Sequence, residues 1–102
     1  MRVLVEGHKY ELSNFENDGT NQVLQFIHKE KVGDSDVLTM IANGTTNEEV
    51  LEVLIDRITN LNSKFPCREN TMAIEKLDEA LMWLNKRTQD RLKRNVEGKH
   101  LA

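Results

Sequence analysis

The sequence predicts an α+β protein in which a small antiparallel β-sheet is followed by an antiparallel hairpin of two helices. Three observations carry this prediction: β-favouring runs fill residues 1–43, the hydrophobic period changes after Asn43-Gly44, and one long amphipathic pattern begins at Arg68. A chain of 102 residues fits one domain. We therefore expect a single domain, with a β-sheet region over residues 1–43 and a helical hairpin over residues 46–97.

The amino-terminal region is expected to form three or four strands. Its apolar and β-branched residues gather in three runs, at residues 3–12, 23–32 and 37–41. Asp18-Gly19 stands in the polar segment between the first two runs and is a strong hairpin signal, because glycine accepts the positive φ that such turns need. Gly33 begins a second turn before the third run. These signals predict one small antiparallel sheet.

The first helix is expected to begin after Thr46 and to end near Ser63. Thr46 and Glu49 have the spacing of a capping box. One face is apolar because large aliphatic side chains recur at spacings of three and four: Val50, Leu51, Val53, Leu54, Ile58 and Leu61. Pro66 ends this helix, since the residue before a proline is biased away from helical geometry. The short connection predicts an antiparallel partner helix.

The second helix is the most informative element of the sequence. From Arg68 to about Arg94 it would extend ~40 Å at ~1.5 Å per residue, which is more than one small core needs. Its seam has heptad-like spacing at Ile74, Leu77, Leu81 and Leu84, and its apolar surface is widened by Ala73, Ala80, Met82 and Trp83. Two apolar faces predict two partners. One face would take the first helix and the sheet, and the other a second copy of the chain.

The charge is acidic overall but basic at the carboxyl-terminal end. The net charge is −3, divided as +4 from Lys86 onward and −7 before it. This distribution suits a small anionic partner better than a long nucleic acid. No apolar run approaches the ~20 residues that span a bilayer, so we expect a soluble intracellular protein without membrane contact. Cys67 is the only cysteine and no paired histidines have zinc-ligand spacing, so neither a metal nor a cofactor is expected.

The second helix carries a recognisable sequence. From Cys67 to Leu84 it reads Cys-Arg-Glu-Asn-Thr-Met-Ala-Ile-Glu-Lys-Leu-Asp-Glu-Ala-Leu-Met-Trp-Leu. This resembles the helical hairpin domain of phage-encoded cyclic-nucleotide sponges, the anti-CBASS and Thoeris anti-defence proteins, whose second helix begins with a small residue and Arg-Glu and continues Leu-Glu-Glu-Ala-x-Met-Trp. Asp78 departs from that pattern, where glutamate is usual. The β-region before the hairpin is more similar to the Thoeris type than to the purely helical anti-CBASS type.

The resemblance implies sequestration without turnover. Such proteins assemble into multimers, often hexamers, and bind cyclic di- and trinucleotides or cyclic ADP-ribose isomers without cleaving them. The resemblance therefore implies a homo-oligomer, with a hexamer favoured, that works in the host cytoplasm and deprives an immune effector of its signal. The alternative is a non-catalytic helical protein-interaction module with no nucleotide ligand, in which the basic end is incidental.

Arg68 and Thr71 are the first candidate ligand-binding residues. Arg68 stands at a helix N-terminus, where unpaired N–H groups and the helix dipole already favour an anion. Thr71 lies one turn further on and offers a hydroxyl. The resemblance implies a trinucleotide pocket to which several subunits contribute this arginine. In the alternative interpretation, Arg68 pairs with a carboxylate such as Glu69 or Glu75, and Thr71 caps the helix.

Lys86, Arg87 and Arg91 form the second candidate site. Arg87 and Arg91 are four residues apart and share a helical face, with Lys86 and Arg94 flanking them, so together they are able to clamp a pyrophosphate or two phosphodiesters. The alternative is a solvated basic helix end that complements the carboxyl-terminal dipole. Resemblance to the Thoeris-type pocket, which uses arginines late in its last helix, favours ligand binding.

Aromatic residues are candidates for stacking on a purine, which contributes ~1 to 3 kcal/mol per base. Phe15, beside the polar turn, and Tyr10, in the first run, are the two candidates. Phe26 is expected in the core, and Trp83 is expected to anchor the core or an oligomer rather than to stack on a ligand.

No catalytic residue is expected. The three histidines, His8, His28 and His100, lie far apart in the sequence, and no serine has the context of a nucleophile elbow. Cys67 lies beside a helix start but has no identified base. These absences favour a binding protein over an enzyme that degrades a nucleotide signal.

Overall fold

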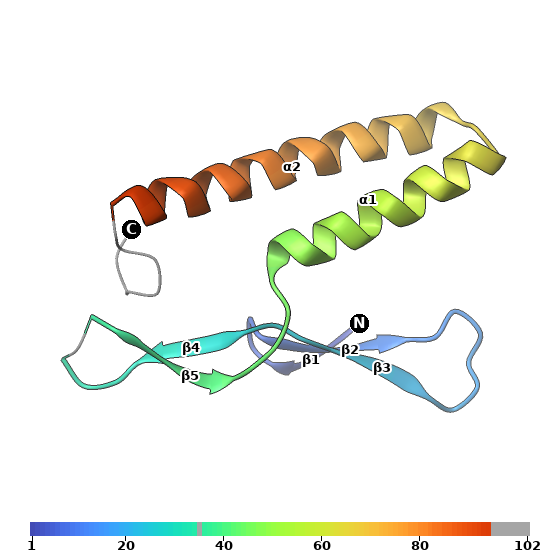
Figure 1. Ribbon diagram of the computed structural model, residues 1–102. Helices are drawn as coiled ribbons and strands as arrows, with labels where there is room; N and C mark the ends of the chain where they lie inside the picture. Colours follow the sequence, from blue (N-terminus) through green and yellow to red (C-terminus); the bar gives the residue numbers. More distant parts are fainter. Residues whose placement is uncertain (35, 95–102) are drawn as a thin grey trace. The chain divides into compact units, whose positions relative to one another are not determined.

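The computed structural model describes residues 1–34 and 36–94 and confirms the α+β class. Strands precede helices along the chain (Figure 1): β1 (Arg2–Val5), β2 (Lys9–Ser13), β3 (Asn21–Gln25), β4 (His28–Lys31), β5 (Leu38–Ala42), α1 (Asn47–Lys64) and α2 (Arg68–Lys93). The chain divides into two compact units, Met1–Thr45 and Thr46–Ala102. Residues 95–97, expected to be helical, and the tail that follows lie outside the described residues.

The described strands number five and form two sheets, where the sequence predicts three or four strands in one sheet. β1, β2 and β3 form an antiparallel sheet in that order, and β4 pairs with β5 in a second one. The first predicted run is divided because Gly7, with φ +76°, turns the chain between β1 and β2. The predicted hairpin between β2 and β3 is confirmed, and Gly19 has φ +82° there.

The second predicted run is divided at Phe26, where the chain passes from one sheet to the other. The Phe26 N–H donates to the His8 carbonyl oxygen at 2.8 Å, which ties this crossing to the turn before β2. The Ile27 N–H donates to the Thr45 carbonyl oxygen at 2.8 Å, and the Thr45 N–H donates to the Gln25 carbonyl oxygen at 2.9 Å. The backbone N–H groups at the crossing, which belong to neither sheet, are therefore hydrogen-bonded within the same small region.

Aromatic rings reinforce this crossing. The rings of His8 and His28 stack with their centroids 3.6 Å apart and their planes at 8°. His28 is only 9% exposed, and its Nε2 lies 2.8 Å from Oε1 of Glu30. Tyr10 meets Phe26 edge to face at 6.0 Å, so Phe26, expected in the core, is half-buried. No apolar side chain in residues 1–34 and 36–94 is fully buried, so these ring contacts and backbone bonds hold the sheets together.

The two helices begin with side-chain caps. Thr46 precedes α1, and its Oγ1 accepts a hydrogen bond from the Glu49 N–H at 3.2 Å, which confirms the predicted start. Cys67 precedes α2, and its Sγ accepts from the Asn70 N–H at 3.4 Å. α1 ends at Lys64, one residue after the predicted Ser63.

Asn62 fixes the corner between the helices. Its Oδ1 accepts from the Cys67 N–H at 3.0 Å, and its Nδ2 donates to Oγ1 of Thr71 at 3.4 Å. The Thr71 hydroxyl in turn donates to the Cys67 carbonyl oxygen at 3.3 Å. Only Phe65, Pro66 and Cys67 lie between α1 and α2, so the helices turn back on each other directly.

α1 and α2 pack along the predicted seam. The seam residues of α2 are half-buried: Ile74, Leu77, Leu81 and Leu84. On the facing side of α1, the half-buried residues are Leu51, Ile55, Ile58 and Asn62. Three residues of the predicted apolar face of α1 are instead exposed: Val53 to 60%, Leu54 to 40% and Leu61 to 44%. The apolar surface of α1 is therefore wider than the strip that α2 covers.

The two helices differ in length. α1 has 18 residues and α2 has 26. At ~1.5 Å per residue these lengths correspond to ~27 Å and ~39 Å. Because the corner aligns one pair of ends, the excess lies at the other, where α2 continues past the start of α1 (Figure 1). The part of α2 after about Lys86 therefore has no α1 residue opposite it.

Gly44→Ala should destabilise the amino-terminal unit. A Cβ at position 44 would press on the Gln25 carbonyl oxygen and lie 2.6 Å from the Phe26 carbonyl carbon, and neither backbone atom moves cheaply. We expect a loss of about 2 kcal/mol in the free energy of unfolding, typical of overpacking, measured by urea denaturation. Asn47→Ala, at an exposed helix position, is the control. Equal stability of the two variants would contradict the close approach at Gly44.

Candidate functional site

The overhanging end of α2 is a cluster of cations beside an aromatic ring. Lys86, Arg87, Arg91 and Arg94 follow Trp83 along this helix. Together with Asp90 these residues line a shallow hollow of about 250 Å³. The structure thus brings together the residues predicted for the second site, Lys86, Arg87 and Arg91 with the flanking Arg94, and adds Trp83 to them. We call this set the basic hollow.

The members of the basic hollow differ in exposure. Arg91 is only 7% exposed, and both Arg91 and Arg94 already interact with another group of the protein. Lys86 and Arg87 are exposed. Arg87, Arg91 and Arg94 recur at spacings of four and three, so their side chains leave one face of α2. A guanidinium presents a planar fork of N–H donors that matches two oxygens of a phosphate, so this face is suited to a phosphorylated anion.

Trp83 is 56% exposed, so the described chain does not use it as a core residue. Its position four residues before Arg87 places it on the face of the cations, and this spacing was the signal in the sequence that could have assigned it to the site. An indole with an open face beside guanidinium groups is able to stack on a purine. Its expected role as an oligomer anchor stays a prediction.

Arg68 and Thr71 lie at the opposite end of α2. Arg68 precedes Arg87 by 19 residues, which separates their Cα atoms by about 28 Å along the helix axis. Arg68 is exposed, and within the described ranges no carboxylate pairs with it, so the alternative pairing with Glu69 or Glu75 is not formed there. The Thr71 hydroxyl is engaged at the corner, while Cys67 supplies the cap. One chain therefore carries two separate candidate sites.

The first turn of α2 adds to the positive character around Arg68. The N–H groups of Arg68 and Glu69 have no intrahelical acceptor, as in the first turn of every α-helix, and they point along the axis toward the corner. The partial positive charge of the helix N-terminus and the guanidinium of Arg68 therefore act in the same place. A phosphate would be stabilised by both.

The two candidate stacking residues lie in the amino-terminal unit. Phe15 is fully exposed, at 104%, in the loop between β2 and β3. Tyr10 is half-buried and holds Phe26 edge to face, so one side of its ring is occupied. Phe15 is thus the more accessible of the two for stacking, and Tyr10 has a structural contact of its own.

The loop that carries Phe15 is ordered by a network of polar side chains. Oδ1 of Asp18 accepts from the Thr20 hydroxyl at 2.6 Å, from the Thr20 N–H at 3.0 Å and from Nδ2 of Asn14 at 3.2 Å. Gln22 donates to Oδ1 of Asn14 at 2.9 Å. The Thr20 hydroxyl, then the Thr20 N–H and then Asn14 lower the pKa of Asp18 from 3.8 to about 2.

Residues 1–34 and 36–94 contain no group of three or more His, Cys, Asp or Glu side chains arranged to hold a metal ion. No described helix combines the length and the apolar character needed to cross a membrane. The only free thiol, on Cys67, is exposed and serves as the α2 cap.

The sequence has relatives among known proteins. Residues 24–89 match the family model of the Acb2/Tad1 hairpin domain, a region that includes Arg68, Thr71, Lys86 and Arg87 and ends before Arg91. The chain is also 58% identical over 60 residues to a protein named Thoeris anti-defense 1 from Bacillus phage SBSphiJ7. That alignment covers 58% of this chain and 42% of the phage protein, so the chain matches less than half of the length of this relative.

Thr20→Val should raise the pKa of Asp18. The substitution removes the hydroxyl donor that lowers this pKa most, so we expect the value to move from about 2 toward 3.8 in a carboxyl NMR titration. Because the folded-state pKa is depressed, the stabilisation from Asp18 is complete above about pH 4 and is lost as the pH falls through about 2. Thr39→Val, on an exposed strand position, should leave Asp18 unchanged. An unshifted pKa in Thr20→Val would refute the network.

Proposed function

Because the chain belongs to the Acb2/Tad1 hairpin-domain family, we propose that it is a phage anti-defence protein that binds and sequesters a cyclic nucleotide immune signal without cleaving it. The proposed ligands are cyclic di- and trinucleotides and cyclic ADP-ribose isomers. The name of the phage relative supports the anti-defence role. We further propose that the protein acts as a homo-oligomer, with a hexamer favoured, in the host cytoplasm.

The basic hollow is the observation that carries this proposal. Cyclic dinucleotides, cyclic trinucleotides and cyclic ADP-ribose isomers combine two or more negative charges with at least one purine. The hollow offers the exposed Arg87 guanidinium and Lys86 ammonium for the charges and the exposed indole of Trp83 for a purine. Its six lining residues include one carboxylate, Asp90, and no histidine, cysteine or hydroxyl group. This composition supports binding and gives no support to nucleophilic cleavage.

Arg68 supplies the second proposed site. Since about 28 Å of helix separates it from Arg87, one nucleotide does not reach both in the same chain. Several copies of α2 that meet at their N-termini would instead bring several Arg68 guanidinium groups around one trinucleotide. The exposure of Arg68 supports this arrangement. The two sites should then be independent of each other.

Sequestration works by mass action. A dissociation constant in the nanomolar range corresponds to about −12 kcal/mol, so a protein present in excess over the signal leaves almost none of it free. The positive field of the α2 end speeds capture of a small anion. The effector is then not activated, and no chemical step is needed.

The exposed apolar side chains favour a second candidate, a helical protein-interaction module. Met82 is 52% exposed, Trp83 56% and Phe65 79%, which is unusual for a chain without a partner. In this alternative the cations only flank a protein interface. Nucleotide binding distinguishes the two candidates.

Calorimetry with cyclic GMP-AMP, cyclic triadenylate and cyclic ADP-ribose isomers should show saturable heat with at least one of them. Intact ligand should be recovered by chromatography after heat denaturation of the complex, because nothing has cleaved it. Absence of heat with every nucleotide would favour the interaction module. Recovery of a cleaved product would instead indicate an enzyme.

Arg87→Ala should weaken binding at the basic hollow by roughly tenfold to a hundredfold, the loss of one charge-assisted contact. Arg68→Ala should abolish binding of the trinucleotide and leave the oligomer and the basic hollow unchanged. Lys76→Ala is the matched control, because it removes one exposed cation of α2 that lines neither site. Wild-type affinity for all ligands in both arginine variants, measured by calorimetry, would remove these residues from the sites.

A further inference from the structure

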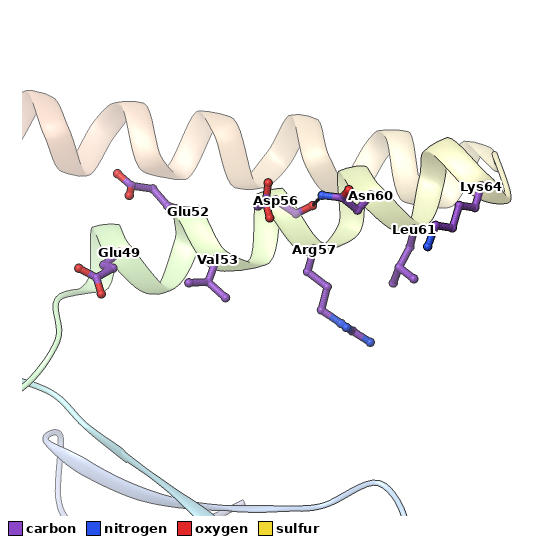
Figure 2. A pocket seen from close by; sticks show the side chains of 8 residues that line it. All are labelled: Glu49, Glu52, Val53, Asp56, Arg57, Asn60, Leu61 and Lys64. Carbon is purple, nitrogen blue, oxygen red and sulfur yellow. Dashed lines mark hydrogen bonds between the residues drawn. The ribbon is translucent and has the colours of Figure 1, made fainter.

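One long face of α1 is left open by the hairpin. Its members recur at spacings of three and four and line a hollow of about 590 Å³: Glu49, Glu52, Val53, Asp56, Arg57, Asn60, Leu61 and Lys64 (Figure 2). With 3.6 residues per turn, these positions lie roughly half a turn away from the seam residues Leu51, Ile55 and Ile58. α2 therefore covers one side of α1, and this set, which we call the outer face, lies on the other.

The charges of the outer face are ordered along the helix. The acids Glu49, Glu52 and Asp56 occupy its amino-terminal half, and the cations Arg57 and Lys64 its carboxyl-terminal half (Figure 2). Within the described ranges neither cation forms an ion pair with the acids beside it. Acidic side chains three and four residues apart repel each other, so this half gains from a cationic partner.

We propose that the outer face binds the same face of a second copy of this chain, with the two α1 helices antiparallel about a two-fold axis. Placing the axis between positions 56 and 57 sets Glu49 of each copy opposite Lys64 of the other. The same register sets Asp56 opposite Arg57, and two-fold symmetry repeats each pair. A parallel arrangement would instead place each charge opposite its own equivalent.

The apolar members of the outer face fit the same register. Val53, which is 60% exposed, lies opposite Asn60 of the other copy, and Leu61, which is 44% exposed, lies opposite the aliphatic stem of Glu52. A shallow crossing of about 20°, a common class of helix packing, keeps the distant Glu49 and Lys64 within reach. One partner therefore pairs Glu49 with Lys64 and Asp56 with Arg57, and covers part of Val53 and Leu61.

This inference rests on the proposed homo-oligomer and names one of its contacts. Eight residues on each copy are fewer than the roughly 20 to 30 per side of a standard interface, so the α1 contact would be one of several in the assembly. It leaves the basic hollow free, because that site lies on α2. Failure of the contact is thus separable from failure of nucleotide binding, which calorimetry measures on the same samples.

Charge reversal tests the contact. Glu49→Lys places a cation opposite Lys64 of the other copy, and the two-fold axis repeats this repulsive pair. We therefore expect roughly tenfold weaker association in a sedimentation-velocity dilution series. The double variant Glu49→Lys/Lys64→Glu restores opposite charges and should recover wild-type association. Asp34→Lys, an equal charge change on an exposed loop residue, should have no effect. Circular dichroism checks that the helices are retained.

Cross-linking tests the two-fold axis directly. Asp56→Cys in a Cys67→Ser background places one thiol near the axis, and the serine preserves a side-chain cap for α2. A short bis-maleimide should then give covalent dimers, whereas Lys76→Cys in the same background should give few. No dimers at position 56, together with unchanged sedimentation of Glu49→Lys, would overturn the proposal. A charge swap that fails to restore association would overturn the antiparallel register.

Discussion

The short, pinned connection between two helices of unequal length is the constraint on which the candidate site depends. Asn62 bonds to both Cys67 and Thr71, so the corner is fixed and the two helix ends there are level. Because α2 has 26 residues and α1 has 18, the additional residues of α2 must lie at its carboxyl-terminal end. That end carries the basic hollow, and no part of α1 lies opposite it, so Trp83, Lys86 and Arg87 are exposed there.

The second consequence of the hairpin is incomplete burial. Two helices side by side cover only one strip of each other, so Val53 and Leu61 of α1 and Met82 and Trp83 of α2 keep between 44% and 60% of their surface exposed. Exposed apolar side chains of this number are characteristic of surfaces that have partners. The proposed two-fold contact of α1, as one contact of the proposed assembly, would cover Val53 and Leu61, whereas Met82 and Trp83 lie on the other helix.

The amino-terminal unit is stabilised differently. Its strands are short, and its described apolar residues are at most half-buried, so the backbone bonds at Phe26 and Thr45 and the stacked rings of His8 and His28 carry much of its order. Gly44 allows the two backbone segments to approach at this point. Its loop between β2 and β3 presents Phe15 to solvent on a frame of polar hydrogen bonds.

The sequence by itself determined the features that depend on nearby residues. The Thr46 cap, the seam from Ile74 to Leu84, the turn at Gly19 and the family resemblance all follow from spacings of a few residues, because helical period, capping and turn chemistry are local. Tertiary structure alone decided the division of the strands into two sheets, since residues 23–32 contain no glycine, proline, asparagine or aspartate to mark the crossing at Phe26. It also decided that the carboxyl-terminal end of α2 is left uncovered by α1, since the bonds of Asn62 to Cys67 and Thr71 align the helices at their other ends. Those outcomes depend on which chain segment covers a surface, and spacing along one element does not carry that information.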